Sequence, residues 1–512
     1  MLTRAGQCGQ WLALNRDRSS RSGQGADADL WNLAPAHLAT LVLLLVPLLL
    51  FFGCVALNAE PPAPRPYTVT HYDAAVEPSF AKPLIFGAVT ISLTALAEHL
   101  TQVELDAADI TVVGCSQGKT HLRYVLVGDI LRIDLTRPLH AGERAEIRIA
   151  YRATPTRGVA FFPDLVYTAF ATSHWLPCND RPDDRATFRL VVVTPERFQV
   201  IASGDPVHES VQGGQRRTEW RKNQPIPTFV FGFAAGLFHF QSRRAGKTQL
   251  RLAVMAHPLP APASTPPQAP ATPPADAGSS LPAAEPPIPA AESKAVDSSP
   301  LYAAVLDDTA SALAFFEDIA GVPYPASAYT TVFAHGEVMQ EAAGFTLLPE
   351  AYLSSLKEDP GDLWLLAHEL AHQWWGIALT GRDWSDFWLN EGVATFVADA
   401  FLEKRFGKQR YQAELARSRK IYEEILTAGN SRPLHFTGWT LPRQAGGPVP
   451  YHKGALFLDA LRSRLGDAAF WPALRSYTHA HIGQSVTAEI FEESMQNSCR
   501  CDLRSLFGEW VY

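Results

Sequence analysis

The first half of the chain is dominated by short runs in which apolar and polar residues alternate. Examples are LIFGAVTISL, ITVVG, ILRIDL and AEIRIAY, and turn sequences such as HAGE and SGD separate such runs. Alternation with a period of two residues is typical of strands that bury one face. The pattern therefore predicts that residues 61–257 form a β-rich domain.

After residue 300 the apolar residues recur at intervals of three and four. The stretch LYAAVLDDTASALAFFEDIAG follows this spacing and ends at Gly321, a typical helix stop. Two short apolar runs predict strands near 329–333 and 344–348. Residues 300–512 are thus expected to be mostly helical with a small sheet. Further helices are expected around 362–374, 390–406, 409–426, 454–465 and 468–480.

A change in composition separates these two regions. Between Pro258 and Pro300 lie 13 of the 39 prolines of the chain, mixed with alanine and serine. Such a composition cannot bury enough apolar surface to form a core. Residues 258–299 are therefore expected to be a disordered linker or a long insertion.

An uncharged stretch near the N-terminus, LATLVLLLVPLLLFFGCVAL at 38–57, indicates a membrane segment. Its roughly twenty residues are enough to cross a hydrocarbon core of about 30 Å. Four arginines precede it and only Arg65 follows closely, so the positive-inside rule places residues 1–37 in the cytoplasm as a tail and the following domains outside. A cleaved signal peptide and lipid attachment at Cys54 are the alternatives.

The composition is that of a globular protein: 47% of residues are apolar, 19% are charged, and the net charge is −8. The chain has no basic cluster, which argues against nucleic acid as a partner. Six cysteines are too few for a disulfide framework. Cys499 and Cys501 flank a single arginine, a poor spacing for a mutual disulfide, whereas Cys115 and Cys178 are either core thiols or a pair.

The sequence HELAH at 368–372 carries the strongest chemical signal. On a helix its two histidines lie on one face and can bind one ion, with Glu369 beside them. The histidine content alone gives roughly 0.5 such pairs by chance, and requiring Glu369 and a further Glu391, with 18 residues between it and His372, lowers this to roughly 0.001. Catalytic zinc takes three protein ligands and leaves a position for water. His368, His372 and Glu391 are therefore expected to bind one Zn²⁺ per chain.

These residues lie in HELAHQWWG and WLNEGVATF, which together resemble the gluzincin aminopeptidases, the family of aminopeptidase N and leukotriene epoxide hydrolase. HWLPCNDRPDDRATFRL at 174–190, FFEDIAGVPYP at 315–325 and VPYHKGALFLDAL at 449–461 resemble further segments of that family. The resemblance covers residues 67–510 apart from the Pro-rich segment. It implies a multidomain α+β fold, with an all-β, saddle-like N-terminal domain followed by a thermolysin-like, mostly helical zinc catalytic domain and the active site between them.

The resemblance also implies roles for individual residues. Glu369 would be the general base for the attacking water, and Tyr451 would donate a hydrogen bond to the oxyanion. Glu341 and Gly344 would bind the substrate, with Glu341 holding its α-amino group. The exopeptidase motif of the family, Gly-x-Met-Glu-Asn, is degenerate, because this chain reads VMQEA there, and Glu337 offers another register.

The expected function is therefore that of a membrane-anchored zinc metalloaminopeptidase, which releases N-terminal residues from peptide substrates outside the cytoplasm, in the periplasm or the extracellular space. Two alternatives stay open. One is a gluzincin with an altered substrate, either an epoxide hydrolase or an endopeptidase, which the degenerate exopeptidase motif favours. The other is a non-catalytic peptide-binding module, against which the retained zinc ligands, Glu369 and Tyr451 speak.

Overall fold

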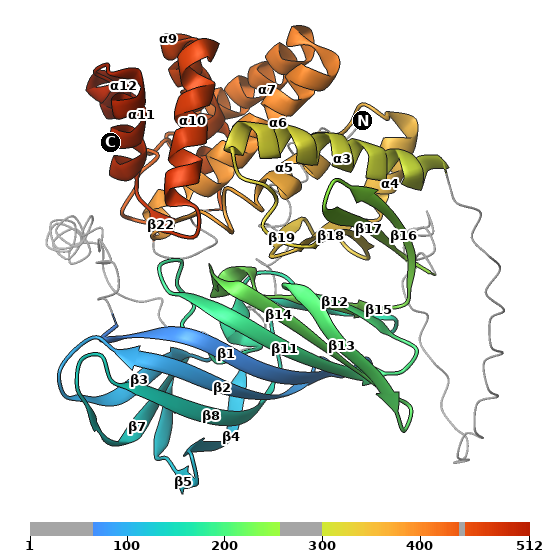
Figure 1. The fold of residues 1–512 in the computed structure, drawn as a ribbon, viewed down its shortest axis with the longest axis vertical. Coiled ribbons are helices and arrows are strands. Elements are labelled where there is room, and N and C mark those ends of the chain that lie inside the picture. Colours follow the sequence, from blue (N-terminus) through green and yellow to red (C-terminus); the bar gives the residue numbers. More distant parts are fainter. Residues whose placement is uncertain (1–64, 257–299, 440–445) are drawn as a thin grey trace, which may run out of the picture.

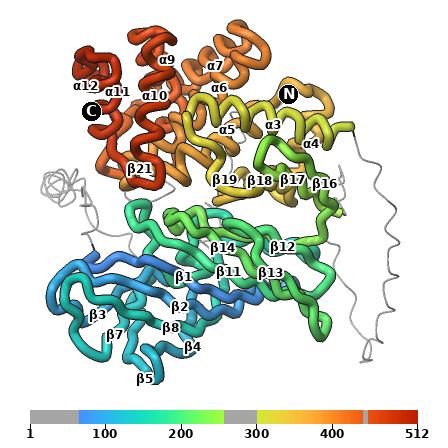
Figure 2. The backbone as a smooth tube through the Cα atoms, in the orientation of Figure 1, coloured from blue at the N-terminus to red at the C-terminus, as the bar shows by residue number. Residues whose placement is uncertain are grey.

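Figures 1 and 2 show the computed structural model, which describes residues 65–256, 300–439 and 446–512. A β region lies below and a helical region above, and the sheet that contains β16 to β20 lies between them (Figure 1). The predicted tail (1–37), membrane segment (38–57) and Pro-rich segment (258–299) lie outside the described residues. Within those residues, no helix combines the length and apolar character needed to cross a bilayer.

The β region is built on an eight-stranded sheet with the order β13-β14-β11-β1-β2-β8-β4-β5. Alternate residues of β1 are buried, as the alternating pattern predicts. A three-stranded sheet (β3-β7-β6) and a four-stranded sheet (β12-β15-β10-β9) share one hydrophobic core with it. The strands are β1 (Tyr67–Pro78), β2 (Ile85–Ala95), β3 (Leu100–Asp106), β4 (Ile110–Gln117), β5 (Thr120–His121), β6 (Tyr124–Val127), β7 (Ile130–Leu139), β8 (Arg144–Ala153), β9 (Val159–Phe161), β10 (Leu165–Thr168), β11 (Arg185–Pro195), β12 (Gln199–Ala202), β13 (Asp205–Gln212), β14 (Gln215–Pro227) and β15 (Phe233–Gly236).

A five-stranded sheet with the order β16-β17-β18-β20-β19 lies under the helices (Figure 1). It joins strands from both sides of the Pro-rich segment, because β17 pairs in parallel with β18. Strands β16 and β17, which alternation alone assigns to the first region, therefore belong to the sheet of the helical region. The strands are β16 (Phe238–Ala245), β17 (Thr248–Met255), β18 (Ala328–Ala334), β19 (Gln340–Ala342) and β20 (Phe345–Pro349).

The helices above this sheet pack around α6, which is buried along nearly its whole length. The predicted helix at 362–374 is shorter in the structure, since its α-helical part ends at Ala371, and α4, α11 and α12 were not predicted. The helices are α3 (Pro300–Ala320), α4 (Ala351–Glu358), α5 (Trp364–Ala371), α6 (Trp388–Phe406), α7 (Lys408–Thr427), α9 (Gly454–Leu465), α10 (Asp467–His481), α11 (Ala488–Cys499) and α12 (Arg504–Trp510), and β21 (Thr380–Gly381) pairs with β22 (Ser485–Val486).

The cysteines correct one expectation from spacing. Cys499 and Cys501 form a disulfide, although a single residue separates them. Arg500 adopts a left-handed conformation at the end of α11, with φ of 52°, and this turn brings the two Cα atoms to 5.2 Å. Cys115 and Cys178 are free, buried thiols and do not form the alternative pair.

Candidate active site

Two helices bring the three predicted zinc ligands together. His368 lies on α5, His372 lies one turn later at its C-terminal cap, and Glu391 lies in the first turn of α6. The Nε2 atoms of His368 and His372 are 3.0 Å apart, and Glu391 Oε2 lies 3.5 Å and 3.4 Å from them. Atoms held about 2.0–2.1 Å from zinc in a tetrahedron are about 3.3 Å apart. The three atoms therefore have the spacing of a zinc site.

The surroundings of these atoms also fit a cation. All three side chains are buried, and Glu391 Oε2 has no hydrogen-bond donor among the described residues. Two imidazole nitrogens and a carboxylate oxygen converging on one point are the donor set that zinc prefers. A buried carboxylate oxygen without a donor is costly unless a cation compensates it.

The electrostatics of the site point the same way. Burial lowers the pKa of His368 to about 4, so its ring is neutral, as a metal ligand must be. Burial also disfavours a charged ring at His372, but Glu391, Glu341 and Glu369 outweigh it and raise that pKa to about 10, so a metal ion would have to displace the His372 proton when it binds. Glu391 is buried as well, yet the two histidines hold its pKa at about 2. The carboxylates thus create a negative potential that favours a bound cation.

Glu369 lies beside the ligands and is fully buried. Burial raises the pKa of its carboxyl well above the usual value, Glu341 and Glu391 raise it further, and His372 opposes them. Carboxyl oxygens of Glu369 and Glu341 lie within 4.8 Å of one another and of a His372 nitrogen. A carboxyl with a raised pKa can accept a proton and keep it until a leaving group needs it.

Tyr451 lies in η4 (Val449–Lys453), a π-helical turn that leads into α9. The centroids of its ring and the His368 ring are 5.6 Å apart, with the planes inclined by 23°. Gly392 and Gly454 let the backbones of α6 and η4 lie close together, because a Cβ on Gly392 would lie 2.9 Å from Gly454 Cα and 3.0 Å from Pro450 O. Sequence reasoning missed this glycine pair, since each glycine alone gives no sign of the backbone that faces it.

Glu341 lies on β19, and its buried carboxyl joins the same cluster. Gln340 Nε2 donates to Glu341 Oε2 at 2.9 Å, while Oε1 has no partner among the described residues. Burial is the largest influence on Glu341 and helps raise its pKa to about 7. Glu337, the other register, is exposed in the loop before β19. The geometry therefore favours Glu341 over Glu337 as the carboxylate that faces the metal ligands.

Gly344 forms the turn between β19 and β20, with φ of 96° in the left-handed region that favours glycine. Its N–H donates to Gln373 Oε1 at 3.0 Å, and Gln373 Nε2 donates to Ala342 O at 2.9 Å. Gln373 directly follows His372, so these two bonds fix the β19–β20 turn to the zinc-binding segment. Sequence reasoning missed this link, and the position of Gln373 directly after His372 is the one signal that could have indicated it.

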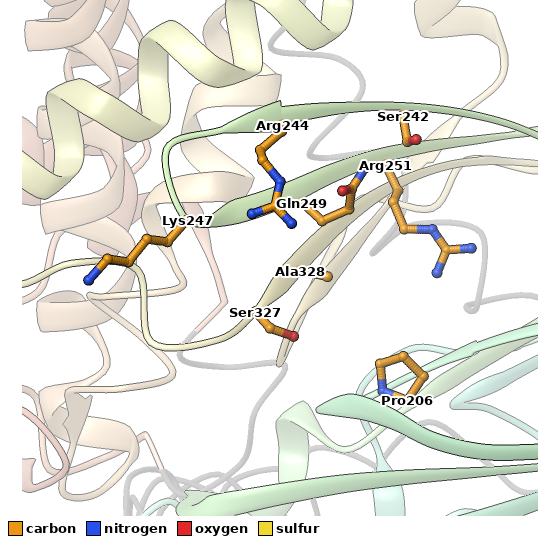
Figure 3. A pocket seen from close by; sticks show the side chains of 8 residues that line it. All are labelled: Pro206, Ser242, Arg244, Lys247, Gln249, Arg251, Ser327 and Ala328. Carbon is orange, nitrogen blue, oxygen red and sulfur yellow. The ribbon is translucent and has the colours of Figure 1, made fainter.

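A pocket of about 500 Å³ opens at the opposite edge of the five-stranded sheet, between the β16–β17 hairpin and β13 (Figure 3). Arg244 and Arg251 lie on one face of the hairpin and line this pocket together with Lys247. Since β19 forms the other edge of the sheet, the pocket is separate from the metal ligands, and its lining contains no histidine, cysteine or carboxylate.

Comparison with known proteins identifies the family to which this architecture belongs. Residues 304–510 match the peptidase family M1 domain, and residues 68–230 match the peptidase M1 N-terminal domain. The chain belongs to peptidase family M1. Membership confirms the predicted family, the fold class of a β-sheet domain followed by a helical catalytic domain, and zinc as the metal. The individual roles of Glu369, Tyr451, Glu341 and Gly344 stay predictions.

The similar curated proteins are aminopeptidases, and two of them show how far the similarity extends. The chain is 22% identical over 362 residues to probable aminopeptidase 2 of Sulfurisphaera tokodaii, covering 68% of this chain and 41% of that protein. It is 24% identical over 385 residues to mouse aminopeptidase B, covering 72% of this chain and 52% of that protein. The chain thus spans about half or less of the length of these curated relatives.

Solved structures match over a larger share of their length. The crystal structure of an M1 zinc metallopeptidase from Deinococcus radiodurans has 26% sequence identity and a TM-score of 0.68, covering 87% of this chain and 94% of that chain. A mutant of the same enzyme has been solved with a bound Tyr-Ser-Ala substrate, and a two-domain M1 zinc metallopeptidase has been solved with L-arginine. The two-domain arrangement described above therefore also occurs in an experimental structure.

Proposed function

We propose that this chain is a zinc aminopeptidase that hydrolyses the first peptide bond of its substrates. The observation that carries the proposal is the position of the Glu341 carboxyl, buried within 4.8 Å of Glu369 and of the zinc ligand His372. A carboxylate at this place can pair with the α-ammonium group of a peptide and so set the distance from the N-terminus to the bond that is cleaved. The crystal structure of the Deinococcus enzyme with a tripeptide supports peptides as the substrate class.

The side chains of this site suit hydrolysis. Zinc held by His368, His372 and Glu391 would polarise the scissile carbonyl and lower the pKa of water. Glu369 would take the proton from the attacking water and pass it to the leaving amine. Tyr451, whose ring lies against His368, would donate a hydrogen bond to the carbonyl oxygen as negative charge develops on it.

The test compares aminoacyl fluorogenic amides with N-acetylated copies of the same compounds. We expect the free-amine compounds to be cleaved and the acetylated ones not, because acetylation removes the charge that Glu341 would bind. In Glu341→Ala, kcat/KM for the free-amine compounds should fall by about ten- to a hundredfold, corresponding to a charged hydrogen bond of about 1.5–3 kcal/mol. Glu337→Ala is the matched control, since its carboxylate is exposed, and it should behave as wild type. Equal cleavage of both compound types would point to an endopeptidase instead.

We also propose that residues 38–57 anchor the protein in a membrane and that the catalytic domain lies outside the cytoplasm. The support is the uncharged apolar stretch and the arginines that precede it. Protease added to intact cells or spheroplasts should then cut within the Pro-rich segment 258–299. Protection of that segment, combined with cleavage before Leu38, would show the opposite orientation.

A further inference from the structure

Trp364 lies against one of the zinc ligands. It occupies the first position of α5, four residues before His368, so both side chains lie on the same face of the helix. The centroids of the indole and imidazole rings are 4.8 Å apart, and their planes are inclined by only 18°. The indole is half-buried, and it covers the imidazole over a flat contact that resists rotation of the ring.

Asp399 holds the indole in this position. It lies on α6, two turns after Glu391, and is 1% exposed. Its Oδ1 accepts the Trp364 Nε1–H bond at 2.8 Å, while Oδ2 has no partner among the described residues. Burial raises the pKa of Asp399 well above its usual value, and the negative charge of Glu414 adds to this. Burying an acidic side chain that has one hydrogen-bond partner among the described residues lowers the stability of the fold. A functional role for the contact between Asp399 and Trp364 would explain why this cost is tolerated.

The two zinc-binding histidines differ in how they are held. His372 Nδ1 lies 3.0 Å from Trp375 O, a good hydrogen bond that fixes its ring. His368 Nδ1 lies 3.5 Å from Thr395 Oγ1, at the outer limit of a hydrogen bond. His368 therefore depends more on packing than His372 does, and the rings of Trp364 and Tyr451 both lie nearly parallel to it.

We propose that Trp364, anchored by Asp399, is a positioning residue that fixes the plane of the His368 ring and thereby the affinity and geometry of the zinc site. The role rests on the proposed zinc-dependent function, but it is a property of the metal site rather than of the substrate. The indole transmits the position of α6 to α5, since Asp399 and Glu391 lie on one helix and Trp364 and His368 lie on the other.

Three variants separate this role from ordinary packing. Trp364→Phe keeps an aromatic ring and deletes the N–H group, Asp399→Leu removes the acceptor, and Asp399→Asn restores an uncharged acceptor of the same shape. Trp471→Phe is the control, because Trp471 is also a half-buried helical tryptophan in the same hydrophobic core but packs against Phe396. The measurements are the zinc dissociation constant by chelator competition, the visible absorption spectrum of the cobalt-substituted full-length protein, and kcat and KM separately.

We expect Trp364→Phe and Asp399→Leu to weaken zinc binding by about ten- to a hundredfold and to shift the cobalt absorption bands. Asp399→Asn and Trp471→Phe should match wild type in both measurements. The proposal is overturned if Trp364→Phe binds zinc with wild-type affinity and an unchanged cobalt spectrum, or if Trp471→Phe weakens zinc binding equally. If Asp399→Leu does not fold, Trp364→Phe still decides. A protein that shows the expected metal effects but cleaves no aminoacyl amide would refute the proposed function and leave the positioning role intact.

Discussion

The contact between Gly392 and Gly454 predicts that one methyl group can disable the site without touching a ligand. In Gly392→Ala the new Cβ would lie 2.9 Å from Gly454 Cα and 3.0 Å from Pro450 O. Carbon atoms normally rest about 3.5–4.0 Å apart, so α6 and η4 must separate by roughly 0.5–1 Å. Both neighbours are backbone atoms, which cannot rotate away. Because Tyr451 lies between Pro450 and Gly454, the displacement should reach its ring.

The size of the effect follows from what Tyr451 would do. Loss of one oxyanion donor typically costs about 10²–10³ in kcat, and a misplacement of about 1 Å can cost about 10². We therefore expect Gly392→Ala to lower kcat by about a hundredfold and to destabilise the fold by about 1–3 kcal/mol through overpacking. The control is Gly508→Ala on α12, where a Cβ meets nothing within 4 Å, and which should leave both quantities nearly unchanged.

A double-mutant cycle with Tyr451→Phe tests the reasoning. If Gly392→Ala acts by displacing Tyr451, it should cost little further activity once the hydroxyl group is absent. The assay is kcat on an aminoacyl amide for wild type, the two single variants and the double variant, with zinc content measured in each. An unchanged hundredfold loss in the Tyr451→Phe background would show that Gly392→Ala acts elsewhere, for example through the neighbouring Glu391.

Three further outcomes are expected. Glu369→Gln should keep about one zinc per chain and lose most turnover, because the base is removed and no ligand is; near wild-type turnover would contradict the mechanism. Glu391→Ala should lower zinc occupancy, and a chelator should abolish activity of the wild type, which added zinc should restore. The hydrogen bond from His435 Nδ1 to Asp386, 2.9 Å long, raises the pKa of His435, so this pair should stabilise the fold below pH ~6.5 and less as pH rises past the folded pKa. The Tm difference between wild type and His435→Gln should therefore shrink as the pH is raised from 6 to 9. Burial raises the pKa of Asp386 and so disfavours its charged form, which keeps this Tm difference small.

The metal site was predictable because its main signal is local. The spacing of His368 and His372 is set by one helical turn, so the sequence alone places both rings on one face. The prediction that Glu391 is the third ligand also required that a second helix lie next to the first, and the resemblance of WLNEGVATF to a known family supplied that information. The alternating and helical patterns likewise predicted the main strands and helices, since burial of one face imposes each period.

The features that escaped prediction depend on segments that meet only in the folded chain. Gln373 forms hydrogen bonds with Gly344 and Ala342, and Trp364 forms one with Asp399, but no spacing in the sequence pairs these residues with one another. The disulfide depends on the conformation of one residue, Arg500, which spacing does not reveal. The joining of β17 to β18 across the Pro-rich segment is also non-local, and no period in the sequence encodes it.

Arg185 links the β region to the segment that connects the two ligand-bearing helices. Its side chain is half-buried between the two regions, and this burial lowers its pKa to about 10. It donates to Thr380 Oγ1 and to the carbonyl oxygens of Ile377 and Ala378, the segment that connects α5 to α6, and no carboxylate pairs with it in the described part of the chain. The hydrogen bonds to Thr380, Ile377 and Ala378 would be lost if the two regions separated, whereas the one to Pro225 O lies within the β region. Because this segment connects His372 to Glu391, Arg185 couples docking of the β region to the geometry of the metal site, together with the packing of Phe229 against Trp384 and Phe387.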